Sequence, residues 1–141
     1  MSYAKLVPEL FCSDLKASLH FYIDLIGFSI LYDRPEDGFA YLDLDGVQLM
    51  LDEPQEAIDS PSSWWTAKPE KPYGRGINLQ IEVSDVDAIC QRLTHNKWPI
   101  FRPMEEKWYR VKDCEMGNRQ FLVQDPDGYL LRFFSDLGER G

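Results

Sequence analysis

The strongest constraint on the fold is a pattern of strand and helix signals that occurs twice along the chain. Each copy opens with a short apolar strand and a Ser-Asp pair, Ser13-Asp14 in the first copy and Ser84-Asp85 in the second, followed by an amphipathic helix. Ser and Asp are favoured at helix N-caps. Each copy closes with a hairpin, whose turn reads Asp43-Leu-Asp-Gly46 in the first and Asp125-Pro-Asp-Gly128 in the second. Because a repeat on this scale folds as similar units, two βαβββ modules are predicted.

The period of the apolar residues places the individual elements. Helices are predicted over 14–26 and 85–96, and Gly27 is expected to end the first of them. Strands are predicted over 6–12, 28–32, 39–44, 47–51, 77–83, 100–102, 108–111 and on both sides of the turn in 120–134, while 136–141 is expected to be a frayed tail. The predicted fold class is α+β, with the tandem βαβββ modules forming a curved mixed-sheet cup and the helices outside.

A chain of 141 residues is expected to be a single domain. The predicted boundaries are 1–141 for the domain, 5–53 for the first module, 54–76 for the connecting loop and 77–136 for the second module. The loop carries four prolines and two adjacent tryptophans: Pro54, Pro61, Pro69, Pro72 and Trp64-Trp65. Irregular chain of this length is usually functional or a linker. The polar residues of the alternating strands are expected to line a concave surface between the two sheets.

Charge and composition exclude several classes of partner. The formal net charge of -9 argues against nucleic acid, because such binding depends on Lys and Arg that neutralise phosphates. No apolar run approaches the roughly 20 residues that span a bilayer, and the N-terminus lacks the apolar segment of a secretion signal. The three cysteines, Cys12, Cys90 and Cys114, have neither disulfide-framework nor zinc-ribbon spacing. A cytoplasmic protein with reduced thiols is therefore expected.

Three motifs carry a resemblance to a known family. They are the strand-Ser-Asp-helix opening of each half, Phe21-Tyr22-x3-Ile26-Gly27-Phe28 at the end of the first helix, and Asp125-Pro-Asp-Gly128-Tyr129 in the last hairpin. In combination they resemble the vicinal oxygen chelate superfamily, which includes glyoxalase I, extradiol dioxygenases, and fosfomycin- and bleomycin-resistance proteins. The resemblance covers nearly the whole chain and implies paired βαβββ modules around a cup.

Catalytic members of this superfamily hold a divalent metal with His and Glu ligands on the first and last strands of each half. The resemblance places those positions here at Val7, Met50 (or Leu49), Asn78 and Arg132. Aliphatic side chains cannot ligate such a cation, and a guanidinium repels it. His20 and His95 are expected on the helices, away from the cup. We therefore expect no metal, no other cofactor and no catalytic residues.

The branch of the superfamily without a metal is similar to the bleomycin-resistance proteins, which sequester a cationic, aromatic drug as acidic dimers. This resemblance implies a small-molecule ligand and a homodimer. Rings and carboxylates suit such a ligand because aromatic faces attract cations. The predicted ligand-binding residues are Glu9, Phe39, Tyr41, Asp43, Met50, Asp52, Trp64, Trp65, Asn78, Glu82, Trp108, Arg110 and Arg132.

Several alternatives stay open at this stage. Of Trp64-Trp65, either tryptophan could form a wall that stacks on a planar ligand or plug the junction between the halves. The segment Trp108-Tyr109-Arg110 suits a pocket or a dimer contact equally well. Arg132 is expected to pair with Glu82 or Glu9, or else to contact an anionic group of the ligand.

Two other functions compete with sequestration. One is a metal-dependent lyase or dioxygenase of the same superfamily with displaced ligands, for example Glu9, Asp52 or Glu82. The other is a small-molecule sensor with the same empty cup and no resistance role.

Overall fold

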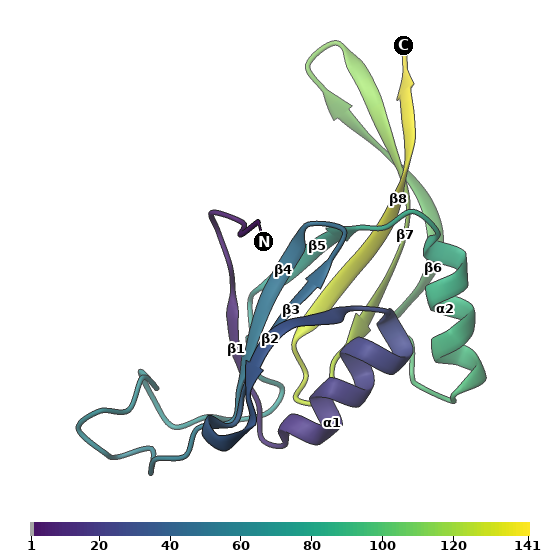
Figure 1. Cartoon of the computed structure of the whole chain (residues 1–141). Helices are drawn as coiled ribbons and strands as arrows, with labels where there is room; N and C mark the ends of the chain where they lie inside the picture. The colour runs from purple at the N-terminus through teal and green to yellow at the C-terminus, as the bar shows by residue number, and fades with distance from the viewer. Residues whose placement is uncertain (1) are drawn as a thin grey trace.

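Two four-stranded sheets form the framework of the molecule, which the computed structural model describes for residues 2–141 (Figure 1). The first sheet has the order β1-β4-β3-β2, with bounds β1 Glu9–Phe11, β2 Ser29–Arg34, β3 Phe39–Leu44 and β4 Val47–Asp52. The second has the order β5-β8-β7-β6, with bounds β5 Asn78–Glu82, β6 Arg102–Val111, β7 Cys114–Gln124 and β8 Leu130–Arg140. In each sheet the module's first strand pairs parallel with its last, and the other pairings are antiparallel. The predicted α+β class and tandem βαβββ order are confirmed.

One helix belongs to each module, and side-chain caps set where both begin. The bounds are α1 Leu15–Leu19, continued by a π-helical segment η1 His20–Ile26, and α2 Val86–His95, with a short 3-10 turn η2 Pro35–Asp37 between β2 and β3. The carboxylates of Asp14 and Asp85 accept hydrogen bonds from backbone N–H groups in the first turns. Gly27 ends the first helix at φ +116°, where glycine has no steric penalty. The predicted N-caps and glycine stop are confirmed, and the π-helical pairing was not predicted.

The two modules share one hydrophobic core. Phe21 is fully buried and packs against Trp98 of the second module, with 5.0 Å between ring centroids. The guanidinium of Arg92 on α2 donates to the carbonyl oxygens of Leu25 and Ile26 at 2.6 and 2.8 Å, so it satisfies acceptors at the end of the first helix. Hydrophobic burial and polar contacts between the helices therefore fix the modules to one another.

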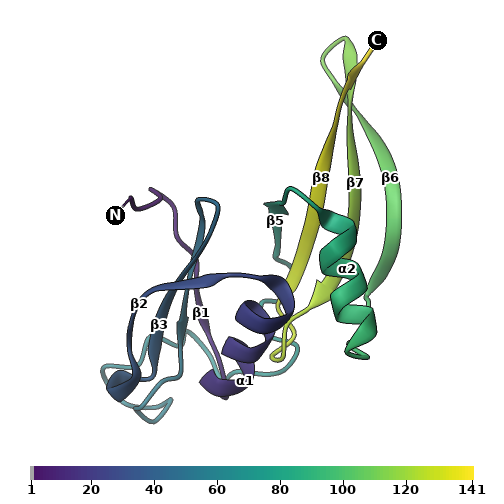
Figure 2. The same ribbon diagram turned by 45° about the vertical axis from the view of Figure 1, so that its right-hand side comes forward.

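The turn of the last hairpin provides the second junction between the modules (Figure 2). Asp127 is 1% exposed and accepts hydrogen bonds from the backbone N–H and hydroxyl of Ser13, while Lys71 lies 3.2 Å away from the same carboxylate. Gly128 has φ +97°, and a Cβ there would approach Pro72 to 2.5 Å. The Asp-Pro-Asp-Gly turn is thus buried between the modules and is more than a hairpin connection.

A three-stranded arm from β6, β7 and β8 extends beyond the body of the second module (Figure 1). The prediction of a frayed tail over 136–141 is wrong, because β8 continues to Arg140, which pairs in register with Glu115 of β7. The guanidinium of Arg140 also lies 4.1 Å from the ring centroid of Trp108. The tail lacks apolar alternation, and backbone pairing with β7 holds it in place instead. Backbone pairing also explains why β6 is one continuous strand where two short strands, 100–102 and 108–111, were predicted. It likewise explains why β7 begins at Cys114, before the predicted start at residue 120.

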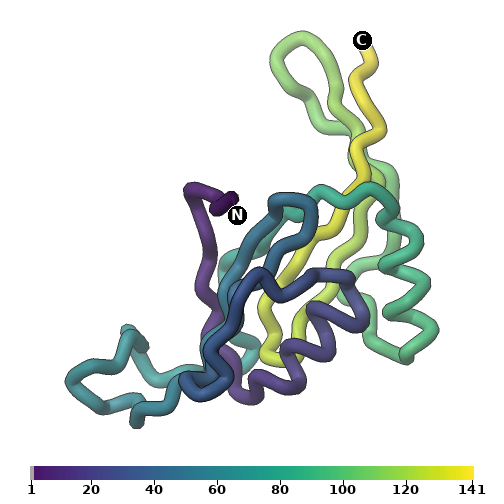
Figure 3. Tube along the Cα trace, viewed as in Figure 1, coloured from purple at the N-terminus to yellow at the C-terminus, as the bar shows by residue number. Residues whose placement is uncertain are grey.

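The two sheets remain separate sheets within the single chain. No strand of the first sheet pairs with a strand of the second among residues 2–141. Figure 2 shows the sheets splayed apart, with α1 near the turn of the β7–β8 hairpin. The loop after β4, residues 53–77, projects from the end of the first sheet (Figure 3). Across residues 2–141, no helix has both the length and the apolar character needed to cross a bilayer.

Candidate functional site

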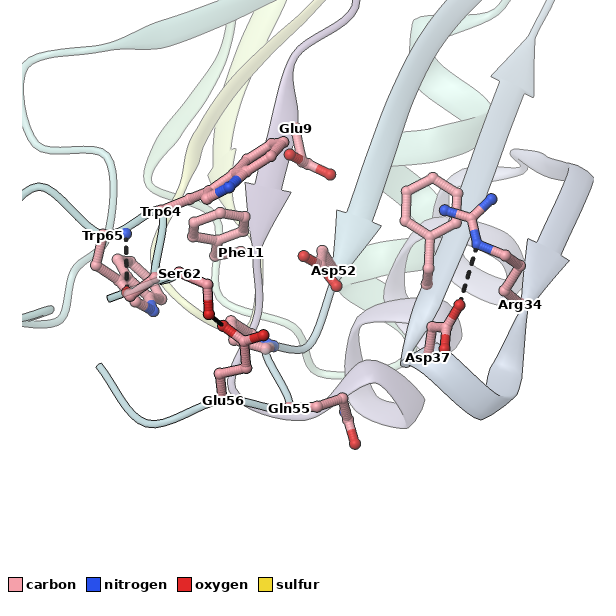
Figure 4. A pocket seen from close by; sticks show the side chains of 13 residues that line it. Glu9, Phe11, Arg34, Asp37, Asp52, Gln55, Glu56, Ser62, Trp64 and Trp65 are labelled. Atoms are coloured by element: carbon pink, nitrogen blue, oxygen red, sulfur yellow. Dashed lines mark hydrogen bonds and ion pairs between the residues drawn. The ribbon is translucent and has the colours of Figure 1, made fainter. Parts of the chain in front are cut away.

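A pocket of about 410 Å³ lies on the first sheet under the 53–77 loop (Figure 4). Strands β1, β2, β3 and β4 supply Glu9, Phe11, Arg34, Phe39 and Asp52, and η2 supplies Asp37. The loop supplies the opposite wall, formed by Pro54, Gln55, Glu56, Ser62, Ser63, Trp64 and Trp65. The pocket is therefore built from the first module and the connecting loop alone.

Strand register explains why these side chains meet. Phe11 is paired with Asp52, Asp52 with Phe39, and Phe39 with Arg34, so one row crosses all four strands. Residues directly opposite one another in neighbouring strands project from the same face of a sheet. Glu9 lies two residues before Phe11 on β1 and therefore shares that face. The floor of the pocket is thus one face of the first sheet along this row of residues, and the loop closes the pocket.

The two loop tryptophans have different roles. Trp65 packs edge-on against Phe11, with 4.7 Å between centroids, and against Tyr73 at 5.7 Å. Trp64 is 76% exposed and contributes its ring to the pocket rim (Figure 4). The Ser63 hydroxyl accepts a hydrogen bond from the Trp65 backbone N–H at 3.2 Å and helps to fix this part of the loop. Trp65 is therefore the packed anchor of the loop, and Trp64 is the free wall.

Four carboxylates and one guanidinium line the pocket. Burial raises the pKa of Glu9, and the nearby charge of Asp52 raises it further, while Arg34 opposes the shift. Burial likewise raises the pKa of Asp52, with Arg34 opposing and Asp37 adding to the rise. Within residues 2–141 neither Glu9 nor Asp52 has an ion-pair partner within 4.0 Å. The pocket therefore holds negative charge that the chain does not neutralise by direct contact.

The only cationic side chain among the lining residues lies at the edge of the sheet. The Arg34 guanidinium carbon is 4.1 Å from the ring centroid of Phe39, and its Nε is 3.3 Å from the Asp37 carboxylate. Phe39 is itself 5% exposed, so the guanidinium covers the remaining ring surface. This cation–π pair is one wall of the pocket.

Three other predicted residues lie on the first sheet but do not line the pocket. The Tyr41 hydroxyl donates to Gln48 at 2.8 Å, and the Gln48 amide donates to Asp43 at 2.9 Å. Tyr41 also stacks on Tyr32, with 5.1 Å between centroids. Met50 stands between Glu9 and Tyr41 in the strand register. Tyr41 and Asp43 are thus engaged in an internal network next to the pocket.

The remaining predicted residues belong to the second module, away from the pocket. Asn78 and Glu82 are exposed on β5, and Trp108 and Arg110 lie on the arm strand β6. Arg132 donates through Nη2 to Gln80 at 2.5 Å, and the expected ion pair with Glu82 or Glu9 is not formed among residues 2–141. The structure therefore brings together five of the predicted residues: Glu9, Phe39, Asp52, Trp64 and Trp65.

Sequence reasoning missed Arg34, Asp37, Phe11 and the polar loop residues of the pocket. The segment Arg34-Pro-Glu-Asp-Gly38 has the composition of a turn, which hides its part in the pocket. The available signal was the short connection between β2 and β3. Such a connection places the residues on its two sides, Arg34 and Phe39, opposite one another.

The donor set does not fit a metal ion of the kind used by catalytic relatives. The four expected positions carry an aliphatic group, a thioether, an amide and a guanidinium, at Val7, Met50, Asn78 and Arg132. Across residues 2–141, no three His, Cys, Asp or Glu side chains come together as a metal-binding group. These positions therefore offer no ligand set for a divalent metal.

Fold and pocket define an α+β protein of paired βαβββ modules with an acidic, aromatic hollow. The chain belongs to the Glyoxalase/Bleomycin resistance protein/Dioxygenase superfamily, whose family model matches residues 5–133. A relative named bleomycin resistance protein, from Geobacillus stearothermophilus, is 29% identical over 139 residues, covering 93% of this chain and 96% of the relative.

Two solved structures share the fold over nearly their whole lengths. TioX from Micromonospora sp. ML1 is 25% identical with a TM-score of 0.70, and the match covers 95% of this chain and 100% of TioX. A protein of unknown function from Agrobacterium tumefaciens str. C58 is 26% identical with a TM-score of 0.69, and the match covers 97% of each chain.

Proposed function

We propose that this protein binds and sequesters a cationic, aromatic small molecule of the bleomycin type, without changing it chemically. The observation that carries the proposal is one pocket that holds the carboxylates of Glu9 and Asp52 together with the rings of Phe11, Phe39 and Trp64. Neither carboxylate has an ion-pair partner among residues 2–141. Carboxylates attract a cation, and aromatic faces stack on planar groups. The net charge of -9 adds a long-range attraction for such a ligand.

The relatives support the ligand class. A protein named bleomycin resistance protein aligns with 93% of this chain at 29% identity. Capture requires no metal or catalytic group of the protein. The residues at the expected metal positions agree with a binding role, because they offer no ligand set for a divalent cation. We place this function in the cytoplasm.

We also propose that the working form is a homodimer. Asn78, Glu82 and Arg132 stand on the second sheet and do not line the pocket of their own chain. A second copy, related by two-fold symmetry, could present these side chains to the pocket and enclose a large ligand. Sedimentation equilibrium tests this part, with a dimer expected at micromolar protein concentration.

A metal-dependent lyase or dioxygenase with displaced ligands is the alternative function. The observation that favours it is the nearness of two carboxylates in one pocket, since the charge of Asp52 raises the pKa of Glu9. Elemental analysis of the purified protein separates the two proposals. A stoichiometric transition metal that is retained through purification, and whose chelation abolishes turnover, would favour the enzyme.

The binding proposal is tested by titration with a bleomycin-class glycopeptide, in both metal-free and copper-bound forms, followed by tryptophan fluorescence. Saturable quenching at micromolar affinity or tighter is expected for at least one form. The double variant Glu9→Gln, Asp52→Asn should weaken it at least tenfold, whereas Asp113→Asn, in the exposed arm turn, should leave it unchanged. Absence of saturable quenching with both forms would exclude this drug class as the ligand.

A further inference from the structure

The guanidinium of Arg34 lies where a ligand cation would be expected. It lies over the Phe39 ring at 4.1 Å, with Asp37 at 3.3 Å, at one end of the row that continues through Asp52 to Phe11. Figure 4 shows the Arg34 and Asp37 side chains on the side of the pocket opposite Trp64. One aromatic face of the pocket that could hold a cation is therefore already covered by a cation of the chain itself.

The contacts that hold Arg34 in place are ones that solvent competes with. Its side chain is 48% exposed, and that of its partner Asp37 is 62% exposed. Ion pairs at such exposure contribute little, and cation–π contacts at exposed sites are weak. The side chain is long, and it stands on the edge strand β2, which has a strand neighbour on one side only. Arg34 can therefore swing away from Phe39 without disturbing the sheet.

The position also defines which cation fits. A guanidinium is planar and delocalised, so it lies flat on a ring while its edge donates to a carboxylate. Phe39 supplies the ring, and the Asp37 carboxylate supplies the opposite charge 3.3 Å from Nε. An ammonium can also contact a ring and a carboxylate, but its compact charge is more strongly hydrated, so it exchanges water for the ring face less readily than a planar cation does.

We infer that Arg34 occupies the cation subsite of the pocket as an internal competitor, and that the subsite selects planar delocalised cations such as amidinium and guanidinium groups. This inference rests on the proposed function, because it specifies the ligand class of the same pocket. A ligand cation displaces Arg34 from Phe39 and takes over its contact with Asp37. The ligand's remaining rings then lie toward Asp52, Phe11 and Trp64.

The test uses three matched probes, 4-aminobenzamidine, 4-aminobenzylamine and 4-aminobenzamide, which carry a planar cation, an ammonium and no charge. Their affinities are measured by calorimetry for the wild type, Arg34→Gln and Arg34→Lys. Removing the competitor should tighten amidine binding about two- to fivefold in Arg34→Gln, because one exposed cation–π contact no longer has to be broken. The amidine affinity of Arg34→Lys should lie between those of the wild type and Arg34→Gln. The neutral amide should bind equally to all three proteins. The wild type should prefer the amidine to the amine.

Arg102→Gln is the matched control. Arg102 also stacks on a phenylalanine, with its guanidinium carbon 4.4 Å from the Phe101 centroid, but it lies outside the pocket on the second sheet. Its substitution should leave amidine affinity unchanged. Equal or weaker amidine binding by Arg34→Gln, including no binding at all, would overturn the inference.

Failure of the inference can be told apart from failure of the proposed function. If the wild type binds the glycopeptide but Arg34→Gln gains nothing for amidine, sequestration stands and the competitor role of Arg34 is wrong. If Arg34→Gln gains amidine affinity but no variant binds the glycopeptide, the subsite stands and the assigned drug class is wrong.

Discussion

The hydroxyl of Tyr22 donates a hydrogen bond to the Asp125 carboxylate across 2.8 Å in the interior of the molecule. Tyr22 belongs to the helix of the first module and Asp125 to the last hairpin of the second. The same carboxylate accepts from the backbone N–H groups of Asp127 and Tyr129 at 2.9 and 3.0 Å. This buried acceptor therefore shapes the hairpin turn and fastens it to the other module.

Replacing Tyr22 with Phe should reduce the free energy of unfolding by about 1.5–3 kcal/mol, the range for hydrogen bonds to charged groups. The buried carboxylate then keeps its backbone donors but loses its side-chain donor. Urea unfolding followed by circular dichroism measures the change. Tyr32→Phe is the control, because the Tyr32 ring stacks on Tyr41 without a hydrogen bond from its hydroxyl among the described residues. Equal stability losses in the two variants would contradict this role.

Asp125 should also impose a specific pH dependence on stability. Burial raises its pKa from 3.8 to about 6, although the hydrogen bond from Tyr22 and those from the two backbone N–H groups oppose the rise. Between these two values the folded state binds more protons than the unfolded state, so this group's contribution to stability falls as the pH rises. Its stabilising contribution is complete below about pH 4 and lost above about pH 6.

The measurement compares wild type with Asp125→Asn by urea unfolding at several pH values. The wild type should lose about 2 kcal/mol relative to the variant between pH 4 and pH 6, as an order of magnitude from the size of the pKa shift. Other carboxyl groups contribute equally to both curves and cancel. Parallel curves across this range would show that Asp125 has an ordinary pKa.

The two loop tryptophans should respond differently to substitution. Trp64→Ala should weaken binding of an aromatic cation several-fold but change stability by less than about 0.5 kcal/mol, because its ring is mostly exposed. Trp65→Ala should cost about 1–2 kcal/mol of stability, since its ring packs on Phe11 and Tyr73. Thermal unfolding and calorimetric titration of both variants check these values. The assignment of Trp64 as wall and Trp65 as anchor is wrong if Trp65→Ala leaves the stability unchanged.

Cation binding should weaken as the solution is acidified. The pKa values of Glu9 and Asp52 are both raised, mainly by burial, so these carboxylates take up protons at a higher pH than exposed ones do. As the pH is lowered, affinity for 4-aminobenzamidine should therefore begin to fall before the pH reaches 4.5, the ordinary pKa of Glu. The neutral 4-aminobenzamide should show no such fall. In Glu9→Gln with Asp52→Asn the fall in amidine affinity above pH 4.5 should disappear, and an unchanged fall in that variant would place the responsible groups elsewhere.

Much of the fold could be predicted because local signals and tertiary packing agree. Alternation over 39–44 matched β3 residue for residue, and Ser-Asp pairs marked both helix starts. The arm was missed because Asp136 to Arg140 lacks an alternating apolar pattern and owes its strand conformation to pairing with Glu115 to Asn118. Such pairing depends on a distant segment and leaves no pattern in the strand itself.

The pocket was only half predictable for a related reason. Alternation identified Glu9, Phe39 and Asp52 as sharing one face of the sheet. The wall formed by Arg34 depends on the register across β2 and β3, which a turn-like sequence conceals. The separation of the second sheet from the pocket depends on how the modules pack, and each module's own strand pattern is the same in either arrangement.

The central claim is that this chain captures its ligand without a metal and releases it unchanged. The most direct measurement is equilibrium dialysis of chelator-treated protein against a metal-free bleomycin-class glycopeptide, followed by mass analysis of the recovered drug. Saturation near one drug per chain is expected, with recovery of the drug at its original mass. Binding that disappears on chelation and returns with a divalent metal, or a drug recovered with an altered mass, would contradict it.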